Sequence, residues 1–348
     1  MVRITRCLFT AALLWHGAFS QSQTQSAPAY TATELPFAIT PDTVEGDPDY
    51  IAPIFPILPF TKYANNPILS PNPANNWESA YLYNPTAIVL NSTIFLLYRA
   101  QDANLTSSIG LAWSTDGTNF TRLSRPIIYA TEPWELGGGT EDPRIVRINS
   151  TFYVTYTAYD GVKPRLCIAT STDLLTWTKR PPYSQTGSTS PSPTSTSPPR
   201  EPTTPNPAPS FYHAVSPDLL NWTSLPADQA FATPLLPWEN RLIEPGPRPS
   251  RRAMGAGYSV GQMLIDPSGS FRFRRANESD ESYEPALRDG PVARIERPML
   301  VPEQPEELEG LVNAVVFAEG LVQFRGRWWL YFGQADSTLG LATAEVQP

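Results

Sequence analysis

Hydrophobic residues come in short runs that recur in pairs along the chain. An aromatic-rich run, residues 94–100 (IFLLYRA), is followed by a run of small and apolar residues, 108–114 (SIGLAWS). The same pairing returns at 152–158 with 165–171 and at 328–333 with 338–343. β-Branched and aromatic residues dominate these runs, and no long stretch repeats every 3.6 residues as an amphipathic helix would. The pattern predicts an all-β fold.

A polar signature closes each pair of runs. It reads Ser-x-Asp followed by an aromatic residue and Thr, and it begins at Ser114, Ser171 and Ser216, which lie 57 and 45 residues apart. Units of four short strands at this spacing are typical of propeller blades. Residues 56–348 are therefore predicted to form a five-bladed β-propeller. An ordinary β-sandwich is the alternative, but its strands would not carry this signature at blade spacing.

The third unit of the repeat is interrupted. Residues 181–210 are nearly all Pro, Ser and Thr, a composition that cannot bury enough apolar surface to order the chain. The pattern resumes only near residue 211, so this stretch either displaces the first strands of the third blade or comes from a faulty gene model. We expect 181–210 to be a disordered insertion and 21–55 to be an extended, Pro-rich leader.

The N-terminus has the features of a secretory signal. Arg3 and Arg6 precede an apolar run, and Ala18 and Ser20 form the small-x-small pattern of a cleavage site. Residues 1–20 are therefore expected to be removed, giving a secreted, extracellular protein. Six Asn-x-Ser/Thr sequons support a glycoprotein, at Asn91, Asn104, Asn119, Asn149, Asn221 and Asn277.

Charge and composition argue against several classes of function. A formal net charge of −8 is unlike that of a nucleic-acid-binding protein, and no segment after the signal is long and apolar enough to span a membrane. No spacing of His, Cys or carboxylates is typical of a metal site, and no cofactor is predicted. Loss of Cys7 with the signal would leave only Cys167, in an apolar run where a buried thiol is expected. The sequence does not indicate an oligomeric state.

The clearest chemistry lies in residues 137–144 (GGGTEDPR). Two carboxylates, Glu141 and Asp142, and the guanidinium of Arg144 stand beside a glycine turn between two predicted strands. Glycine lets backbone approach a ligand closely, and a cationic neighbour allows two acids to differ in pKa. This arrangement suits acid–base chemistry on a sugar, although the motif alone would more often be a charged turn with a surface ion pair.

Other short motifs follow in a fixed order along residues 65–348. They include 66–69 (NPIL), 77–78 (WE), 83–87 (YNPTA), 97–100 (LYRA), 139–144 (GTEDPR), 244–247 (EPGP), 302–310 and 331–336 (YFGQAD). Their order and spacing resemble glycoside hydrolase family 130, whose members are five-bladed propellers that act on β-mannosides.

The resemblance implies a set of site residues. In this family the Asp of the EDPR motif donates the proton, proposed to act through a sugar hydroxyl, which gives that role to Asp142. Hydrolases of the family activate water with glutamates, and Glu244 and Glu307 match those positions, Glu307 by its spacing to Gly310. The implied substrate-binding residues are Asn84, Arg99, Glu141, Arg144, Asp336 and Trp77. From the residues alone, Glu244 could equally cap a loop, Glu307 stands in an acidic run typical of a solvated face, and Trp77 is as often core.

The sequence thus predicts a secreted, inverting hydrolase of β-linked mannosides, similar to a β-1,2-mannosidase, with an oligosaccharide or glycan as substrate. The family also contains phosphorylases, which bind phosphate partly through third-blade residues that find no match here. Other five-bladed glycosidases, acting on arabinans, xylosides or fructosides, are a further alternative, because fold alone does not choose the substrate. A carbohydrate-binding propeller without catalysis is the last alternative, motivated by the damaged third blade.

Overall fold

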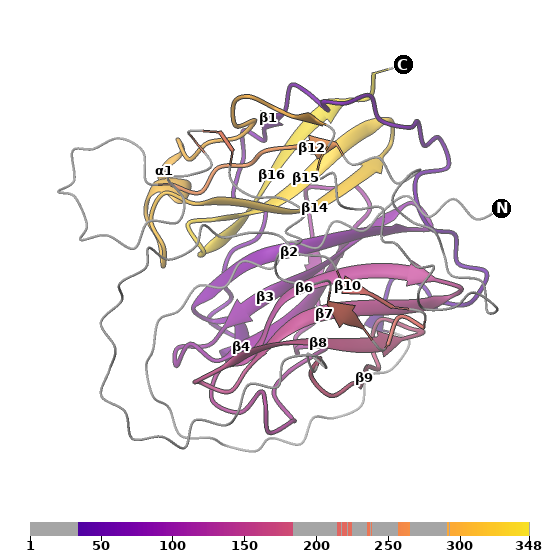
Figure 1. Cartoon of the computed structure of the whole chain (residues 1–348), viewed down its shortest axis with the longest axis vertical. Coiled ribbons are helices and arrows are strands. Elements are labelled where there is room, and N and C mark those ends of the chain that lie inside the picture. The colour runs from indigo at the N-terminus through magenta and orange to yellow at the C-terminus, as the bar shows by residue number, and fades with distance from the viewer. Residues whose placement is uncertain are drawn as a thin grey trace. The chain divides into compact units, whose positions relative to one another are not determined.

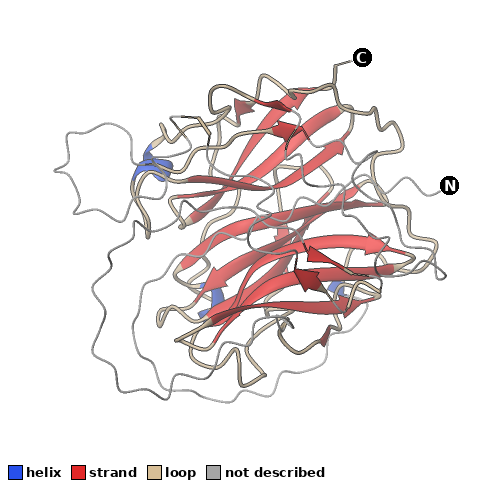
Figure 2. Ribbon diagram, in the orientation of Figure 1, coloured by secondary structure: helices blue, strands red, loops and turns tan. Residues whose placement is uncertain are grey.

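The computed structural model describes residues 34–183, 257–264 and 293–347, together with residues 214–216, 218–220, 222–224, 235, 236, 238 and 291. Strands dominate, which confirms the all-β prediction (Figures 1 and 2). The elements are β1 (Thr61–Lys62), the 3-10 helix η2 (Asn76–Glu78), β2 (Tyr81–Leu90), β3 (Thr93–Gln101), β4 (Ser107–Ser114), β5 (Thr121–Arg122), β6 (Gly139–Ile148), β7 (Thr151–Tyr159), β8 (Pro164–Ser171), β9 (Thr178–Lys179), β10 (Ala214–Val215), β11 (Thr223–Ser224), β12 (Met263–Leu264), β13 (Ala293–Arg294), α1 (Pro305–Leu308), β14 (Val316–Phe324), β15 (Arg327–Gln334) and β16 (Thr338–Glu345).

Three antiparallel meanders account for most of the strands, and all three belong to one unit of the chain. The first runs β2-β3-β4-β5 and the second β6-β7-β8-β9, and one parallel pair, Ser107 with Gly139, joins them into an eight-stranded sheet. The third runs β14-β15-β16, and β1 from the other end of the chain adds its fourth strand. The short pairs β10-β11 and β12-β13 belong to a second unit.

Strand β3 carries a continuous apolar run, residues 94–98, because both of its faces are covered. Phe95 and Leu97 lie in a cluster with the second meander, where they share a core with Phe152 and Val154. The alternate residues Ile94 and Leu96 pack in another cluster with Val322, Phe324 and Tyr331 of the third meander. Successive side chains of a strand point to opposite faces, so a continuous hydrophobic run is what a sheet covered on both sides requires.

The repeated Ser-x-Asp signature forms a turn after the third strand of a meander. Ser114 donates its hydroxyl to Asp116, and Asp116 accepts the backbone N–H groups of Thr118 and Asn119. Ser171 and Asp173 repeat these contacts. In each case a short polar side chain satisfies the backbone of the turn, which explains why the residue types recur at a fixed spacing.

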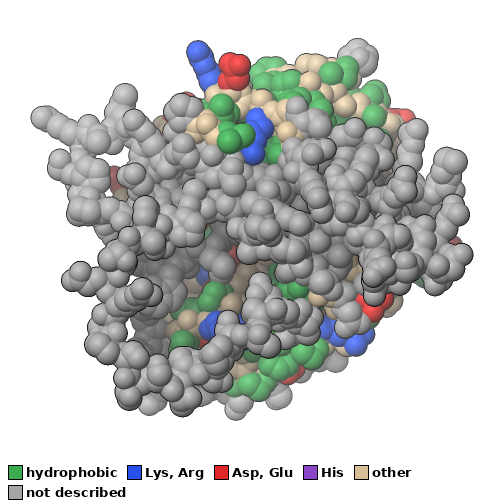
Figure 3. All heavy atoms as spheres, in the orientation of Figure 1, with side chains coloured by type: hydrophobic (Ala, Val, Ile, Leu, Met, Phe, Trp, Pro, Cys, Tyr) green, Lys and Arg blue, Asp and Glu red, His purple; other side chains and the backbone are tan. Residues whose placement is uncertain are grey.

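Part of the predicted leader packs against the first meander. Leu35 is buried in the same cluster as Phe95, with Phe37 beside it, and Gly46 donates its backbone N–H to Val89. Residues 1–33, and 184–210 of the predicted insertion, lie outside the described residues. No helix in the described part of the chain is long and apolar enough to cross a membrane. On the face in Figure 3, described side chains of both charges stand among apolar and neutral ones.

Candidate active site

The first strand of each meander breaks its regular pairing near its start. The residues at these breaks are Asn84 in β2, Asp142 in β6 and Glu319 in β14. A β-bulge of this kind leaves one residue unpaired and redirects its side chain. The three strands therefore each present one polar side chain at an equivalent position.

The local sequence explains two of these bulges. Asn84 and Asp142 each precede a proline, and their φ angles are 51° and 53°. Pro85 and Pro143 have no N–H to donate, so the hydrogen-bond ladder cannot continue through them. Asn and Asp are among the few non-glycine residues that tolerate positive φ. The Asn-Pro and Asp-Pro dipeptides thus place both side chains out of the regular alternation of the strand.

Arg99 of β3 connects the acidic side chains of this site. Its Nη1 donates to Oδ1 of Asp142 at 3.1 Å, its Nη2 to Oε1 of Glu141 at 2.6 Å, and its Nε to Oγ of Ser107 at 3.0 Å. The guanidinium also lies over the ring of Tyr83, 4.6 Å from its centroid. Burial alone would lower the pKa of Arg99, but Glu141 and Asp142 outweigh burial and raise it. Arg99 is therefore a fixed cation between two carboxylates.

In the described part of the chain, one oxygen of Asp142 accepts hydrogen bonds and the other does not. Asn84 donates its Nδ2 to Oδ1 at 2.6 Å, and Arg99 donates to the same atom. The side chain of Asp142 is 20% exposed. Among the described residues no hydrogen bond reaches Oδ2, so this oxygen is the one available to a ligand.

The pKa values of two carboxyls near Asp142, those of Glu141 and Asp336, are raised. Burial raises the pKa of Glu141, while Arg99 opposes the shift and Asp142 adds to it. Asp336, in the turn between β15 and β16, has its pKa raised to about 6 by burial, again with Arg99 opposing and Asp142 adding. Groups with such pKa values are typical of sites that transfer protons.

Arg144 reaches across to the third meander. Its Nη2 donates to Oε1 of Glu319, and its Nη1 donates to the carbonyl of Pro143 at 2.8 Å. The Arg144 and Glu319 side chains are 13% and 2% exposed. Burial lowers the pKa of Arg144 to about 10, and the charge of Asp142 opposes that shift.

Two glycines of the GGGTEDPR motif allow neighbouring strands to approach closely. A Cβ on Gly139, whose φ is +107°, would lie 2.0 Å from the carbonyl oxygen of Ser107. A Cβ on Gly138 would lie 2.1 Å from the ring of Tyr159. The close approach at Gly139 is thus one between β4 and β6, and Ser107 of β4 hydrogen-bonds both Arg99 and Glu141.

The structure places Trp77 in hydrophobic packing and not beside the carboxylates of Glu141 and Asp142. Its ring stacks on Tyr98 with centroids 6.2 Å apart, and its Nε1 donates to the carbonyl of Ser124 at 2.9 Å. A Cβ on Gly110 would lie 2.6 Å from its ring. These contacts give Trp77 the core role that was the alternative to sugar stacking.

Glu307 is also placed apart from the cluster. Its side chain is fully buried, and its Oε2 accepts Lys62 Nζ at 2.7 Å and the backbone N–H groups of Glu303 and Gln304. Among the described residues, no hydrogen bond or ion pair of Glu307 reaches Asp142. Glu307 was implied as a catalytic glutamate, with a solvated acidic run as the alternative; its described contacts match neither, because it caps α1 and neutralises a buried lysine.

The other two meanders contain a buried ion pair of the same kind. Glu78 and Glu135 are fully buried, and they pair with Arg122 at 3.1 Å and with Lys179 at 2.5 Å. In all three cases the cation follows a Thr on the outermost strand, in β1, β5 and β9. The repeated aromatic-Thr-Lys/Arg tripeptides, at 60–62, 120–122 and 177–179, are the sequence signal that would have identified these buried pairs.

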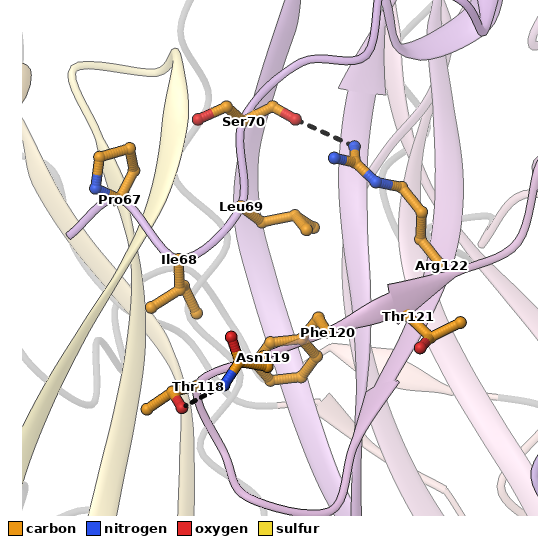
Figure 4. A pocket seen from close by; sticks show the side chains of 9 residues that line it. All are labelled: Pro67, Ile68, Leu69, Ser70, Thr118, Asn119, Phe120, Thr121 and Arg122. Carbon is orange, nitrogen blue, oxygen red and sulfur yellow. Dashed lines mark hydrogen bonds between the residues drawn. The ribbon is translucent and has the colours of Figure 1, made fainter. Parts of the chain in front are cut away.

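A separate shallow pocket lies beside β5 (Figure 4). It is lined by Pro67, Ile68, Leu69, Ser70, Thr118, Asn119, Phe120, Thr121 and Arg122. Arg122 already donates to Glu78 and to the carbonyl of Ser70 at 2.9 Å, and the lining holds no carboxylate. We assign it no catalytic role.

The described site therefore unites six side chains. They are Asn84, Arg99, Glu141, Asp142, Arg144 and Asp336, joined through the contacts and charge interactions given above. Reasoning from sequence missed Glu319, Ser107 and Tyr83, which contact the predicted residues directly. Glu244 lies outside the described residues and stays a prediction. No group of three or more His, Cys, Asp or Glu in the described part of the chain is arranged to hold a metal ion.

Comparison with known proteins decides the family. The profile of glycoside hydrolase family 130, described as beta-1,4-mannooligosaccharide phosphorylase, matches residues 59–193 and 204–348. The chain belongs to glycoside hydrolase family 130. One relative, a 1,2-beta-oligomannan phosphorylase from Thermoanaerobacter sp. (strain X514), is 30% identical over 84% of this chain and 99% of its own length. A beta-1,2-mannobiose phosphorylase from the same organism is 29% identical over 82% of this chain and 97% of its own.

A solved structure agrees with this assignment. A glycosyl hydrolase from Bacteroides ovatus superposes with a TM-score of 0.62 at 26% identity, covering 82% of this chain and 93% of the other. Both of these named relatives are phosphorylases of β-1,2-linked mannosides, and the family profile is likewise described by an enzyme that acts on mannooligosaccharides.

Proposed function

We propose that this protein is a secreted, inverting glycoside hydrolase that cleaves β-linked mannosides, with β-1,2 linkages as the first substrates to test. The names of the two Thermoanaerobacter relatives support β-1,2-mannosides as the substrate class. We also propose that residues 56–348 form a five-bladed β-propeller with an interrupted third blade, after a signal peptide at 1–20 and the leader at 21–55. The three meanders, each of four strands, support this architecture.

Asp142 is the proposed proton donor, and its one-sided attachment is the observation that carries the proposal. Asn84 and Arg99 fix Oδ1 while Oδ2 has no partner among the described residues. A leaving sugar oxygen needs a proton, and a donor must be held in place but open on one side. Arg99, Glu141, Arg144 and Asp336 are proposed to bind sugar hydroxyls around it.

A second carboxylate is needed to activate water on the opposite side of the sugar, about 6.5–9.5 Å away in inverting enzymes. Glu244 is our proposal for this base. It stands before Pro245 in the sequence, just as Asn84 and Asp142 stand before Pro85 and Pro143. We do not retain Glu307 in this role, because its buried contacts are those of a structural carboxylate.

The charges of the described cluster support hydrolysis over phosphorolysis. Four carboxyls, those of Glu141, Asp142, Asp336 and Glu319, surround the guanidiniums of Arg99 and Arg144, and each guanidinium is already in an ion pair. Bound phosphate is usually held by cations that provide charge and N–H donors. Export also favours hydrolysis, because a phosphorylase would release its sugar phosphate outside the cell.

A phosphorylase is the second candidate, favoured by the names of both relatives. In the sequence, three arginines follow Glu244 and could supply a phosphate site: Arg248, Arg251 and Arg252. The two activities differ in their products, so a direct assay separates them.

The test is to incubate the purified protein with β-1,2-mannobiose, with and without inorganic phosphate, and to follow products by proton NMR. We expect free mannose without phosphate, formed first as the α-anomer, and a loss of about 10²- to 10⁴-fold in Asp142→Asn. Mannose 1-phosphate formed only with phosphate would overturn the hydrolase in favour of the phosphorylase. Turnover of aryl arabinosides or xylosides alone, or binding without turnover, would instead support the remaining alternatives.

Export is tested separately by the intact mass of the product secreted from cells expressing the full chain. We expect loss of residues 1–20, retention of 181–210, and added glycan mass that an endoglycosidase removes. A product retaining Met1 and carrying no glycan would contradict the proposed location.

A further inference from the structure

The buried hydroxyl of Ser107 joins two side chains of the proposed active site. Its Oγ accepts a hydrogen bond from Nε of Arg99 at 3.0 Å and one from Nε2 of Gln101 at 3.1 Å, and it lies 3.1 Å from Oε1 of Glu141. A hydroxyl has one hydrogen to donate and two lone pairs that accept. Because both lone pairs are occupied, the hydrogen of Ser107 is donated to Glu141.

The amide of Gln101 fixes this arrangement. Its Nε2 also donates to the carbonyl oxygen of Leu105 at 3.2 Å, and a carbonyl only accepts, so the amide cannot turn over and present its oxygen there. The oxygen of the amide, Oε1, is buried without a hydrogen-bond partner in the described part of the chain. Such an atom costs stability, so it is expected where the side chain serves a function.

The repeated meander does not itself require this pair of polar residues. Gln101 and Ser107 form the last pair of β3 with β4, and the last pair of β7 with β8 is Tyr159 with Pro164. Proline has no polar side chain, so the second meander has no hydrogen bond between side chains at this position. The amide and the hydroxyl therefore serve something specific to the first meander, and the carboxylate that they reach is Glu141.

Glu141 is held in the same manner as Asp142. Its Oε1 receives hydrogen bonds from Ser107 and from Nη2 of Arg99, while its Oε2 receives none from the described residues. The side chain of Glu141 is 14% exposed, whereas Ser107 is fully buried and Gln101 is nearly so. Oε2 of Glu141 is therefore open to a ligand, and Gln101 can act on that ligand only through Ser107.

We propose that Gln101 is a positioning residue, which orients the Ser107 hydroxyl so that Glu141 presents Oε2 as a charged acceptor to a sugar hydroxyl. This inference rests on the proposed function in placing the sugar beside Glu141 and Asp142. It gives a role in substrate binding to a residue that contacts neither carboxylate.

The charge state of Glu141 provides a readout that a purely structural role would not change. Burial raises the pKa of Glu141, the charge of Arg99 lowers it, and the hydrogen bond from Ser107 lowers it as well. The charged and titratable groups facing this cluster are Arg99, Asp142, Tyr83 and Asp336. Without the Ser107 hydrogen bond, Glu141 should become protonated at a pH higher by about half a unit to one unit. Activity should then be lost at correspondingly higher pH on acidification.

The experiment compares pH profiles of kcat/KM on β-1,2-mannobiose, with phosphate present so that either hydrolysis or phosphorolysis is followed. The proteins are the full secreted chain, Gln101→Met, Ser107→Ala and their double variant. Glu141→Gln identifies the part of the acidic limb that Glu141 contributes. We expect each single variant to lower kcat/KM by about 2- to 10-fold and to shift that limb to higher pH. The double variant should match Ser107→Ala, because Gln101 acts through that hydroxyl.

Gln323→Met is the matched control. Gln323 is also a buried glutamine, and its amide holds backbone through two hydrogen bonds with Ile51. Loss of this amide should lower the melting temperature and leave the pH profile unchanged.

An unshifted acidic limb in folded Gln101→Met would overturn the inference, as would a shift in the double variant equal to the sum of the two single shifts. An acidic limb that Glu141→Gln leaves unchanged would overturn it as well. Should Gln101→Met not fold, Gln101→Asn takes its place, because an amide shorter by one methylene cannot make both hydrogen bonds.

The proposed function fails on a different readout, which is the product formed by the unchanged protein. Mannose 1-phosphate in place of mannose would refute the hydrolase, while the shift of the acidic limb would still decide the role of Gln101. If the unchanged protein binds mannobiose without turnover, the pH dependence of its affinity, measured by calorimetric titration of the same variants, replaces that of kcat/KM.

Discussion

Asn84 of β2 donates a hydrogen bond of 2.6 Å to Oδ1 of Asp142 in β6, so the two residues link neighbouring meanders at their bulges. Arg99 of β3 donates to the same oxygen at 3.1 Å. Two donors on one oxygen fix the plane of the carboxyl. The position of the proposed proton donor is therefore set by the packing of the first meander against the second.

Asn84→Ala should slow the reaction without unfolding the protein. A hydrogen bond to a charged group contributes about 1.5–3 kcal/mol, so its loss in the transition state corresponds to roughly a 10- to 100-fold lower kcat/KM. Steady-state kinetics on a β-mannoside measure this, with thermal unfolding as the check on folding. Asn65→Ala is the control, because Asn65 is an exposed amide that donates to Tyr63. Full activity in Asn84→Ala would show that Arg99 alone positions Asp142.

Asp336→Asn should stabilise the protein at neutral pH while lowering its activity. Burial raises the pKa of Asp336 to about 6, against about 3.9 for an unfolded Asp. Ionising this group therefore costs the folded state more than the unfolded one, and the stability present below about pH 4 is lost as pH rises through 6. Asp336→Asn should therefore raise the free energy of unfolding by on the order of 1–3 kcal/mol at pH 7.5, and by less at pH 4.5.

Urea unfolding of Asp336→Asn at the two pH values measures this difference. Asp42→Asn, at an exposed position, serves as the control. An equal effect of Asp336→Asn at pH 4.5 and 7.5 would contradict a buried, pH-dependent carboxylate.

The strands and the EDPR part of the site follow from local sequence. Aromatic and small-residue runs predicted β3 with β4, β7 with β8, and β15 with β16, because aromatic and β-branched residues favour strands. The EDPR residues were predicted from the motif itself, whereas Asn84 and Arg99 were implied by the resemblance to family 130; the structure brings these residues together through hydrogen bonds.

Long-range burial was not predictable in the same way. Glu307 stands among other glutamates, and its burial depends on Lys62, 245 residues earlier in the chain. Glu319 lies in an apolar strand, and only the alignment of its bulge with those of β2 and β6 indicates that it faces the site. Trp77 was implied as a substrate-binding residue, and nothing nearby in sequence shows that its ring would stack on Tyr98.

We expect the single variant Lys62→Met to lower the free energy of unfolding much more than the double variant Lys62→Met, Glu307→Gln does. The single change leaves Glu307 fully buried with an uncompensated charge, which costs about 3–5 kcal/mol, whereas the double variant removes both charges. Urea unfolding of both singles and the double gives the coupling energy between the two side chains. We expect Glu307→Gln to keep its kcat per folded molecule. A stable but inactive Glu307→Gln would restore Glu307 to the catalytic set.

Gly139→Ala should separate β4 from β6 and so weaken the site. The new Cβ would lie 2.0 Å from the carbonyl oxygen of Ser107, whose hydroxyl bonds Arg99 and Glu141. Gly326→Ala is the matched control: its φ of +71° imposes a similar backbone penalty, of about 1 kcal/mol, but nothing lies within 4 Å of the added carbon. We expect Gly139→Ala to lower both the melting temperature and kcat/KM well below those of Gly326→Ala. If the two variants show the same losses, the backbone conformation at Gly139 explains the whole loss of stability. The contact between β4 and β6 would then not set the position of Arg99.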